Sequence, residues 1–150
     1  MPDVLSTHTR SDRSLLAVSV ACFAVSGVAT GTTDAIVPTL GGTAIAILGV
    51  YTLARYASVV SKRTLALAAL SAWLSFLAVA GVHVIGPAAI GDVAPGPVGA
   101  VVLTLDAVTW ATLLSACGTT TFLGFREYGS QAGCETPEEQ VLDGETTSDY

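Results

Sequence analysis

The stretch LALAALSAWLSFLAVAGVHVIG, Leu65 to Gly86, runs for 22 residues without an Asp, Glu, Lys or Arg. Because an α-helix rises about 1.5 Å per residue, roughly 20 residues cross the ~30 Å hydrocarbon core of a bilayer. The stretch lacks the strict alternation of a barrel strand and is too long for one. It therefore predicts a transmembrane helix and an all-α membrane fold.

Three further apolar runs accompany this one, and their lengths are 18, 21 and 28 residues. Each is long enough to span a bilayer, the first only just. Only 12% of the chain is charged, whereas soluble domains carry about a quarter, so the charges are too few for an ordinary globular surface. We expect residues 14–125 to form a transmembrane domain with the lipid bilayer as solvent. Its spans are predicted at about 14–31, 36–56, 65–86 and 98–125.

Polar segments flank this domain. Residues 1–13 form a short N-terminal arm, and residues 126–150 form a tail with seven acids and one base. A segment this acidic and this poor in apolar residues is expected to be disordered. With its net charge of −6, five Arg against one Lys and no Asn, the chain resembles in composition small membrane proteins of salt-loving archaea, for which acidic surfaces are an adaptation.

All the basic residues fall on one side of a four-span arrangement, because the first-to-second and third-to-fourth connections contain neither Lys nor Arg. The positive-inside rule makes that side cytoplasmic. The sequence therefore predicts a multi-pass protein of the cell membrane with both termini in the cytoplasm. The residues that set this topology are Arg10, Arg13, Arg55, Lys62, Arg63 and Arg126.

The first run also fits a cleaved signal peptide. It has a basic flank, and the GVA that precedes Thr30 is a small-x-small cleavage pattern. Cleavage would leave three spans and place the new N-terminus outside. The sequence leaves this alternative open.

Small residues are the candidates for packing the helices together. Lipid tails are as apolar as Leu, so transmembrane helices associate through close approach at Gly, Ala and Ser. Short connections favour antiparallel neighbours, which predicts an up-down four-helix bundle. The same small-residue faces can contact another membrane protein or a second copy of the chain. The helix-packing candidates are Gly27, Gly31, Gly42, Ala46 and Gly49.

Asp106 is the one charged residue inside the fourth run. A carboxylate at mid-bilayer costs roughly 2.5–3.5 kcal/mol, so it is expected to face a polar partner. His83, Thr109 and Ser75 are candidates for a shared polar site that binds a proton or cation. Alternatively, the membrane part of the fourth run begins near Leu105, and Asp106 then lies at the outer interface at little cost. Both interpretations stay open.

Known catalytic patterns are absent from the sequence. It contains no HExxH, CxxC, GxSxG, Walker or GxGxxG motif, so we expect no catalytic, metal-binding or cofactor-binding residues. An acidic chain without a basic patch also disfavours nucleic-acid binding. The sequence favours a non-enzymatic scaffold or accessory subunit of a membrane complex. The alternative is a small transporter or ion-pathway component that uses Asp106 and His83.

Overall fold

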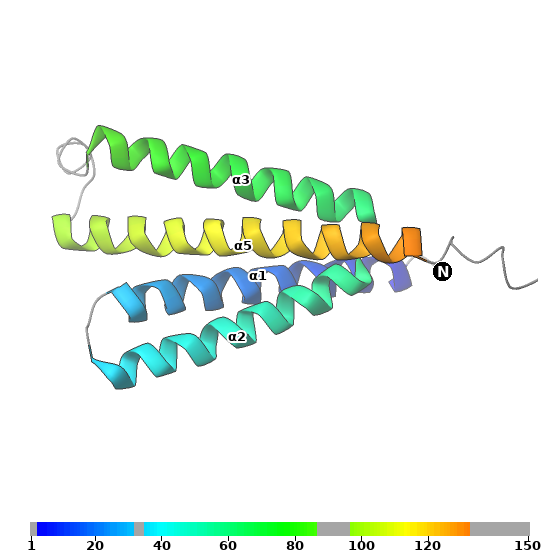
Figure 1. Ribbon diagram of the computed structural model, residues 1–150, viewed down its shortest axis with the longest axis horizontal. Coiled ribbons are helices and arrows are strands. Elements are labelled where there is room, and N and C mark those ends of the chain that lie inside the picture. The colour runs from blue at the N-terminus through cyan, green and yellow to red at the C-terminus, as the bar shows by residue number, and fades with distance from the viewer. Residues whose placement is uncertain (1–2, 32–34, 87–96, 133–150) are drawn as a thin grey trace, which may run out of the picture.

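The computed structural model describes residues 3–31, 35–86 and 97–132, with side chains for 13–31, 35–86 and 97–130. Within these ranges every helix is long and apolar enough to cross a membrane. This confirms the prediction of an all-helical fold with four helices of spanning length. The helices are α1 (Asp3–Gly31), α2 (Ile36–Val59), α3 (Lys62–Ile85) and α5 (Val98–Ala132) (Figure 1).

The outer helices extend beyond the apolar runs. α1 begins in the polar arm at Asp3, and α5 continues past Phe125 to Ala132. The first seven residues of the predicted disordered tail are therefore helical, and residues 133–150 lie outside the described residues. Lys62 contacts the extension of α5, since its Nζ lies 3.2 Å from Glu127 Oε2 and 3.2 Å from Ser130 Oγ. These contacts tie the last turns of α5 to the start of α3.

Two residues connect α2 to α3 and reverse the chain. The Val60 N–H still donates to Tyr56 O, 3.1 Å away, which completes the last turn of α2. Ser61 then caps α3, because its Oγ accepts a hydrogen bond from the Thr64 N–H at 3.1 Å. Such a cap satisfies one of the free N–H groups at a helix start. A connection this short makes α2 and α3 antiparallel.

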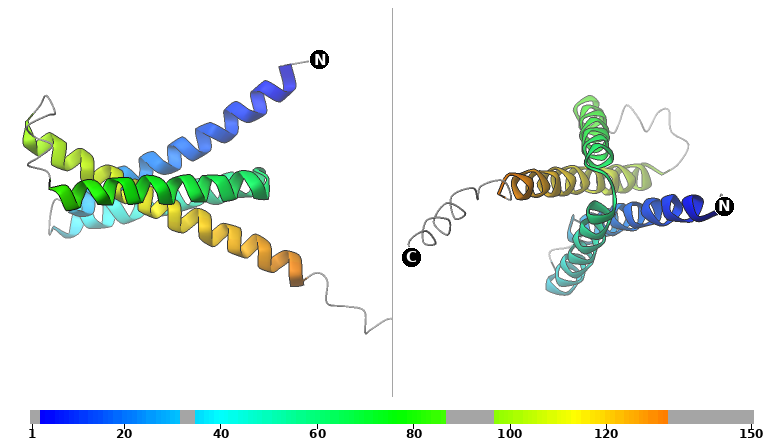
Figure 2. Two further views of the ribbon diagram at one scale, coloured as in Figure 1. Left: turned by 90° about the horizontal axis from the view of Figure 1, so that it is seen from above. Right: turned by 90° about the vertical axis from the view of Figure 1, so that its right-hand side faces the viewer.

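The helices form two hairpins, α1 with α2 and α3 with α5, which are joined mainly where α1 packs against α5. α2 and α3 lie on opposite sides of the α1–α5 pair and diverge from their shared turn (Figures 1 and 2). In a closed up-down bundle every pair of sequence neighbours packs together. Here α2 and α3 form no packed interface, because α1 and α5 separate them. The bundle is therefore open on this side.

The buried core is small and lies toward the α2–α3 turn. Most other apolar side chains point outward, including Val37, which is 80% exposed, and Val84, which is 88% exposed. An apolar exterior over so small a core suits a protein solvated by lipid rather than water. The apolar core residues are Phe23, Leu53, Tyr56, Ala57, Val60, Leu65 and Ala111.

Close approach of α1 and α2 depends on glycine. A Cβ built at Gly49 would lie 2.7 Å from a Phe23 ring carbon, and one at Gly42 would also meet α1 side chains. At the same place Ser19 Oγ donates a 2.9 Å hydrogen bond to the main-chain oxygen of Gly49. Ala46, between the two glycines, is half-buried. The α1–α2 interface is thus a hydroxyl-to-glycine contact supported by close packing.

Two glycines on different helices admit side chains from the facing helix. Gly27 of α1 lies directly under Trp110 of α5, and Gly118 of α5 lies under Leu53 of α2. A side chain at either glycine would overlap its neighbour. Gly31, by contrast, has no heavy atom of the described residues within 4 Å of its Cβ position. Gly27 therefore contributes to the α1–α5 interface, whereas Gly31 does not.

Candidate functional site

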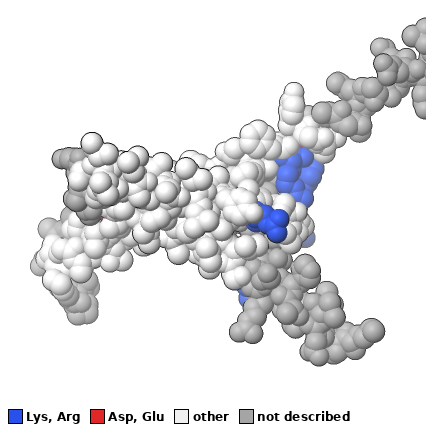
Figure 3. Space-filling view, turned by 90° about the horizontal axis from the view of Figure 1, so that it is seen from below, with Lys and Arg blue, Asp and Glu red and all other residues white. Residues whose placement is uncertain are grey.

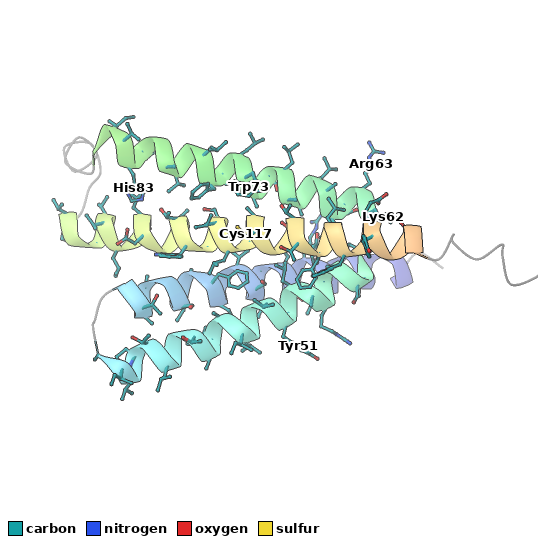
Figure 4. The ribbon with its side chains drawn as sticks, viewed as in Figure 1. Tyr51, Lys62, Arg63, Trp73, His83 and Cys117 are labelled. Carbon is teal, nitrogen blue, oxygen red and sulfur yellow. The ribbon has the colours of Figure 1, made fainter. Side chains whose placement is uncertain are left out.

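The α3–α5 interface carries polar contacts along its length. Three of them fix the antiparallel register of the two helices, and the labelled side chains of α3 can be followed in Figure 4. The contacts are Lys62 Nζ to Glu127 Oε2 at 3.2 Å, Trp73 Nε1 to Thr120 Oγ1 at 3.1 Å and His83 Nε2 to Thr109 Oγ1 at 2.9 Å.

His83 and Thr109, two of the predicted site residues, are brought together by this register. The Thr109 hydroxyl donates its single hydrogen to Leu105 O at 2.7 Å. His83 Nε2 must therefore be the donor in the contact with Thr109. The pair links the C-terminal end of α3 to α5.

Asp106 lies level with the ends of neighbouring helices. Counting three residues along each helix from the His83–Thr109 contact brings Asp106 opposite Gly86, the cap of α3. Counting four residues along each helix from the contact between Trp110 and Gly27 likewise brings Asp106 opposite Gly31, the last residue of α1. The acid therefore sits where α1 and α3 stop, rather than in the middle of the apolar layer.

The other predicted partners do not surround Asp106. The acid is exposed, and within the described part of the chain it forms neither a hydrogen bond nor an ion pair. No salt bridge joins His83 to Asp106, so the His83 ring nitrogens lie more than 4.0 Å from the Asp106 carboxylate oxygens. Ser75 lies well inward on α3, where its Oγ donates to Ser71 O at 2.8 Å. The four residues thus do not form one site.

The described basic side chains gather at the opposite end of the molecule (Figure 3). Arg126 follows Asp106 by 20 residues on the same helix, and the 19 residues between them are uncharged. At about 1.5 Å per residue the two charges are roughly 30 Å apart, which matches the thickness of a hydrocarbon core. Arg10 belongs to α1, but its side chain lies outside the described residues. The described basic residues are Arg13, Arg55, Lys62, Arg63 and Arg126.

Arg126 has a packing role that the sequence analysis missed. Its Nη1 donates to Ala57 O at 2.9 Å and to Val60 O at 2.7 Å, two carbonyls at the C-terminal end of α2. Such carbonyls lack intrahelical partners and attract a cation. The acceptors lie 69 and 66 residues away in the sequence, so no local pattern could reveal the contact.

A half-open groove of about 180 Å³ runs between α1, α3 and α5, and we call it the α1–α3–α5 groove. α1 and α3 form no packed interface of their own, so the groove floor is α5. Its walls are mostly apolar and small. The hydroxyl residues that line it are Ser71, Ser75, Thr112, Ser115 and Thr119.

Ser115 differs from every other serine and threonine described on α5. The others each donate a hydrogen bond to a main-chain carbonyl of the helix. Ser115 is only 5% exposed, and its Oγ has no hydrogen-bond partner. A buried hydroxyl left without a partner costs about 1–3 kcal/mol. Ser115 therefore lines the groove with its hydroxyl oxygen covered by the surrounding side chains. The sequence analysis missed Ser115, because Ser and Thr are frequent along all of α5.

Among the described residues, no group of three or more His, Cys, Asp or Glu side chains is placed to hold a metal ion. The strongest unassigned feature is thus the groove with Ser115. Comparisons with protein-family models, with curated proteins and with solved structures each found no match to this chain.

Proposed function

We propose that the protein is a non-enzymatic scaffold or accessory subunit of a membrane complex, and that it holds its partner through the α1–α3–α5 groove. The observation that carries this proposal is the half-open groove, whose lining on α3 and α5 consists of Ala, Ser and Thr side chains. Ser115 lies 9 residues from Asp106 and 11 from Arg126, roughly 14 and 17 Å along the helix. Small side chains at that depth let a helix of another protein approach closely, which favours a protein partner.

The proposed setting is the cell membrane, with four spans and both termini in the cytoplasm. The cluster of basic side chains at one end supports this orientation through the positive-inside rule. The spacing of about 30 Å between Asp106 and Arg126 matches the thickness of a hydrocarbon core, which supports a membrane span between these two residues of α5. Reporter tags on the two termini test the orientation, and tags on opposite faces of the membrane would contradict it.

A transporter or ion pathway that uses Asp106 and His83 has less support. Asp106 is exposed at the level of the helix ends, and His83 hydrogen-bonds to Thr109 instead of the acid. An acid at that level needs no buried partner. We therefore favour the scaffold.

The experiment blocks the groove without disturbing the outer surface. Ala72 lines the groove on α3, whereas Leu77 is 61% exposed and lies outside the lining. Tagged full-length chain is purified in mild detergent as wild type, Ala72→Phe and Leu77→Phe. We expect a complex of fixed stoichiometry with wild type and Leu77→Phe, and its loss with Ala72→Phe. A wild-type chain that purifies as a lone monomer would overturn the proposal.

A further inference from the structure

We propose that a second pocket, at the basic end of the molecule, binds the phosphate-bearing headgroup of an anionic lipid. The pocket has a volume of about 380 Å³, is partly open, and lies between the start of the apolar part of α1 and the α2–α3 turn. We call it the Arg13 pocket, after the basic side chain in its lining. The proposal is separate from the scaffold role and from the α1–α3–α5 groove, and it needs only that the chain lies in a membrane.

The Arg13 pocket is built where membrane-spanning segments begin and end. The first such segment begins at Arg13, the second ends at Val59, and the third begins at Lys62. Arg13 and Val59 line the pocket, as does Ser61, which directly precedes the third segment. Residues at the ends of spans lie at the level of the lipid headgroups, just outside the ~30 Å hydrocarbon core. The layer that surrounds this pocket is therefore the headgroup layer.

The exposed polar side chains of the pocket have hydrogens to donate. The Arg13 guanidinium forms no hydrogen bond or ion pair with a described residue, and no Asp or Glu of the described chain lines the pocket. Ser61 Oγ and Thr64 Oγ1 lie 2.8 Å apart, so one hydroxyl hydrogen is used between them. The other has no acceptor among the described residues. A guanidinium and a spare hydroxyl hydrogen fit an anion with several acceptor oxygens, and phosphate is such an anion in the headgroup layer.

The inner wall of the pocket is apolar. Tyr56 is 5% exposed and Val60 is 8% exposed, and both line the pocket together with Leu16, which lies about one turn further into the membrane than Arg13. A polar rim over an apolar wall matches the junction between the headgroup and the acyl chains of a lipid. A free phosphate ion has no apolar part that can cover this wall. The lining therefore favours a lipid over a soluble phosphate.

The surrounding charge favours a lipid with a net negative charge. The described basic side chains gather at this end of the molecule (Figure 3). Lys62 and Arg126 already have protein partners. The side chains of Arg13, Arg55 and Arg63 form no hydrogen bond or ion pair within the described part of the chain, and of these three only Arg13 lines the pocket. Bases at a membrane surface attract anionic lipids, and Arg13 places one such base where a headgroup can be held.

The test measures how phosphatidylglycerol with a fluorescent acyl chain binds to purified full-length protein in mild detergent. Arg13→Gln removes the charged donor from the pocket, and we expect the Kd to rise about tenfold, the lower end of what hydrogen bonds to charged groups contribute. Arg63→Gln is the matched control, because it removes the same charge at the same end but outside the lining. It acts only through screened attraction, so we expect a rise of less than about twofold. Equal weakening by both changes, or no saturable binding by the wild type, would overturn the site.

Competition on the wild-type protein identifies the ligand without any variant. Unlabelled phosphatidylglycerol is expected to displace the fluorescent lipid, whereas phosphatidylcholine and millimolar inorganic phosphate are expected to displace little of it. Displacement by inorganic phosphate would assign the pocket to a soluble anion and overturn the lipid. Equal displacement by phosphatidylcholine would overturn the selection for negative charge. The scaffold role fails separately, because Ala72→Phe tests it in the other groove, and Ala72 does not line the Arg13 pocket.

Discussion

Trp110 of α5 lies against Gly27 of α1, so closely that any side chain at position 27 would overlap the indole. This contact joins the two hairpins at the interface on which the whole arrangement depends. Glycine at this position is therefore a packing requirement.

Gly27→Ala is expected to destabilise the folded protein by about 1–3 kcal/mol, the usual cost of overpacking a tight contact. The measurement is the thermal or denaturant unfolding of purified protein in detergent, followed by circular dichroism. Gly31→Ala is the matched control on the same helix, because no atom from the described part of the chain lies within 4 Å of its Cβ position. Equal destabilisation by both changes would contradict the packing role of Gly27.

Ser19→Ala removes the hydrogen bond to Gly49 across the α1–α2 interface. Interhelical hydrogen bonds of this kind average about 0.6 kcal/mol and reach about 1.7 kcal/mol, and we expect a loss of unfolding free energy in that range. Ser58→Ala serves as the control, since the Ser58 hydroxyl is exposed and bonds only to Arg55 O within its own helix. If the two variants unfold alike, the Ser19 contact does not stabilise the interface.

Arg126→Gln separates packing from topology. It removes the charged donor to Ala57 O and Val60 O, and hydrogen bonds to charged groups contribute about 1.5–3 kcal/mol. Arg63→Gln removes the same charge from the same end of the molecule, but Arg63 is exposed and forms no hydrogen bond or ion pair with a described residue. Unfolding in detergent should show a clear loss for Arg126→Gln and less than about 0.5 kcal/mol for Arg63→Gln. A comparable loss in both would mean that net charge, rather than the cap on α2, is what stabilises the fold.

The depth of Asp106 is tested by moving the acid. Asp106→Asn is expected to change membrane insertion little, because the residue is exposed and level with the ends of α1 and α3. Adding Leu113→Asp to that variant shifts the acid two turns inward and should cost about 2.5–3.5 kcal/mol in an insertion assay. An Asp106→Asn variant that loses ion or proton flux in reconstituted vesicles would instead restore the transport hypothesis.

Helix number and approximate position could be predicted from the sequence, because apolar run length reports directly on the bilayer core. The ends were less predictable. α5 passes Phe125, and there Lys62 contacts Glu127 and Ser130 from another helix. The open side of the bundle could not be predicted either. A short connection makes consecutive helices antiparallel, but it does not determine which helices pack against each other. Whether Asp106 faces a partner depended on the α3–α5 register, which arises from contacts distant in sequence.

The division into two hairpins has a consequence for how the chain can be assembled. The chain passes from the first hairpin to the second through Val60 and Ser61. Each hairpin contains a helix-helix interface of its own, α1 with α2 and α3 with α5. Separate polypeptides that end and begin at this link therefore retain every buried surface of the intact protein. When the two pieces are produced together, we expect them to associate into a two-chain form of the protein. The packing of Trp110 on Gly27 and the hydrogen bonds from Arg126 to the end of α2 would hold the two pieces together.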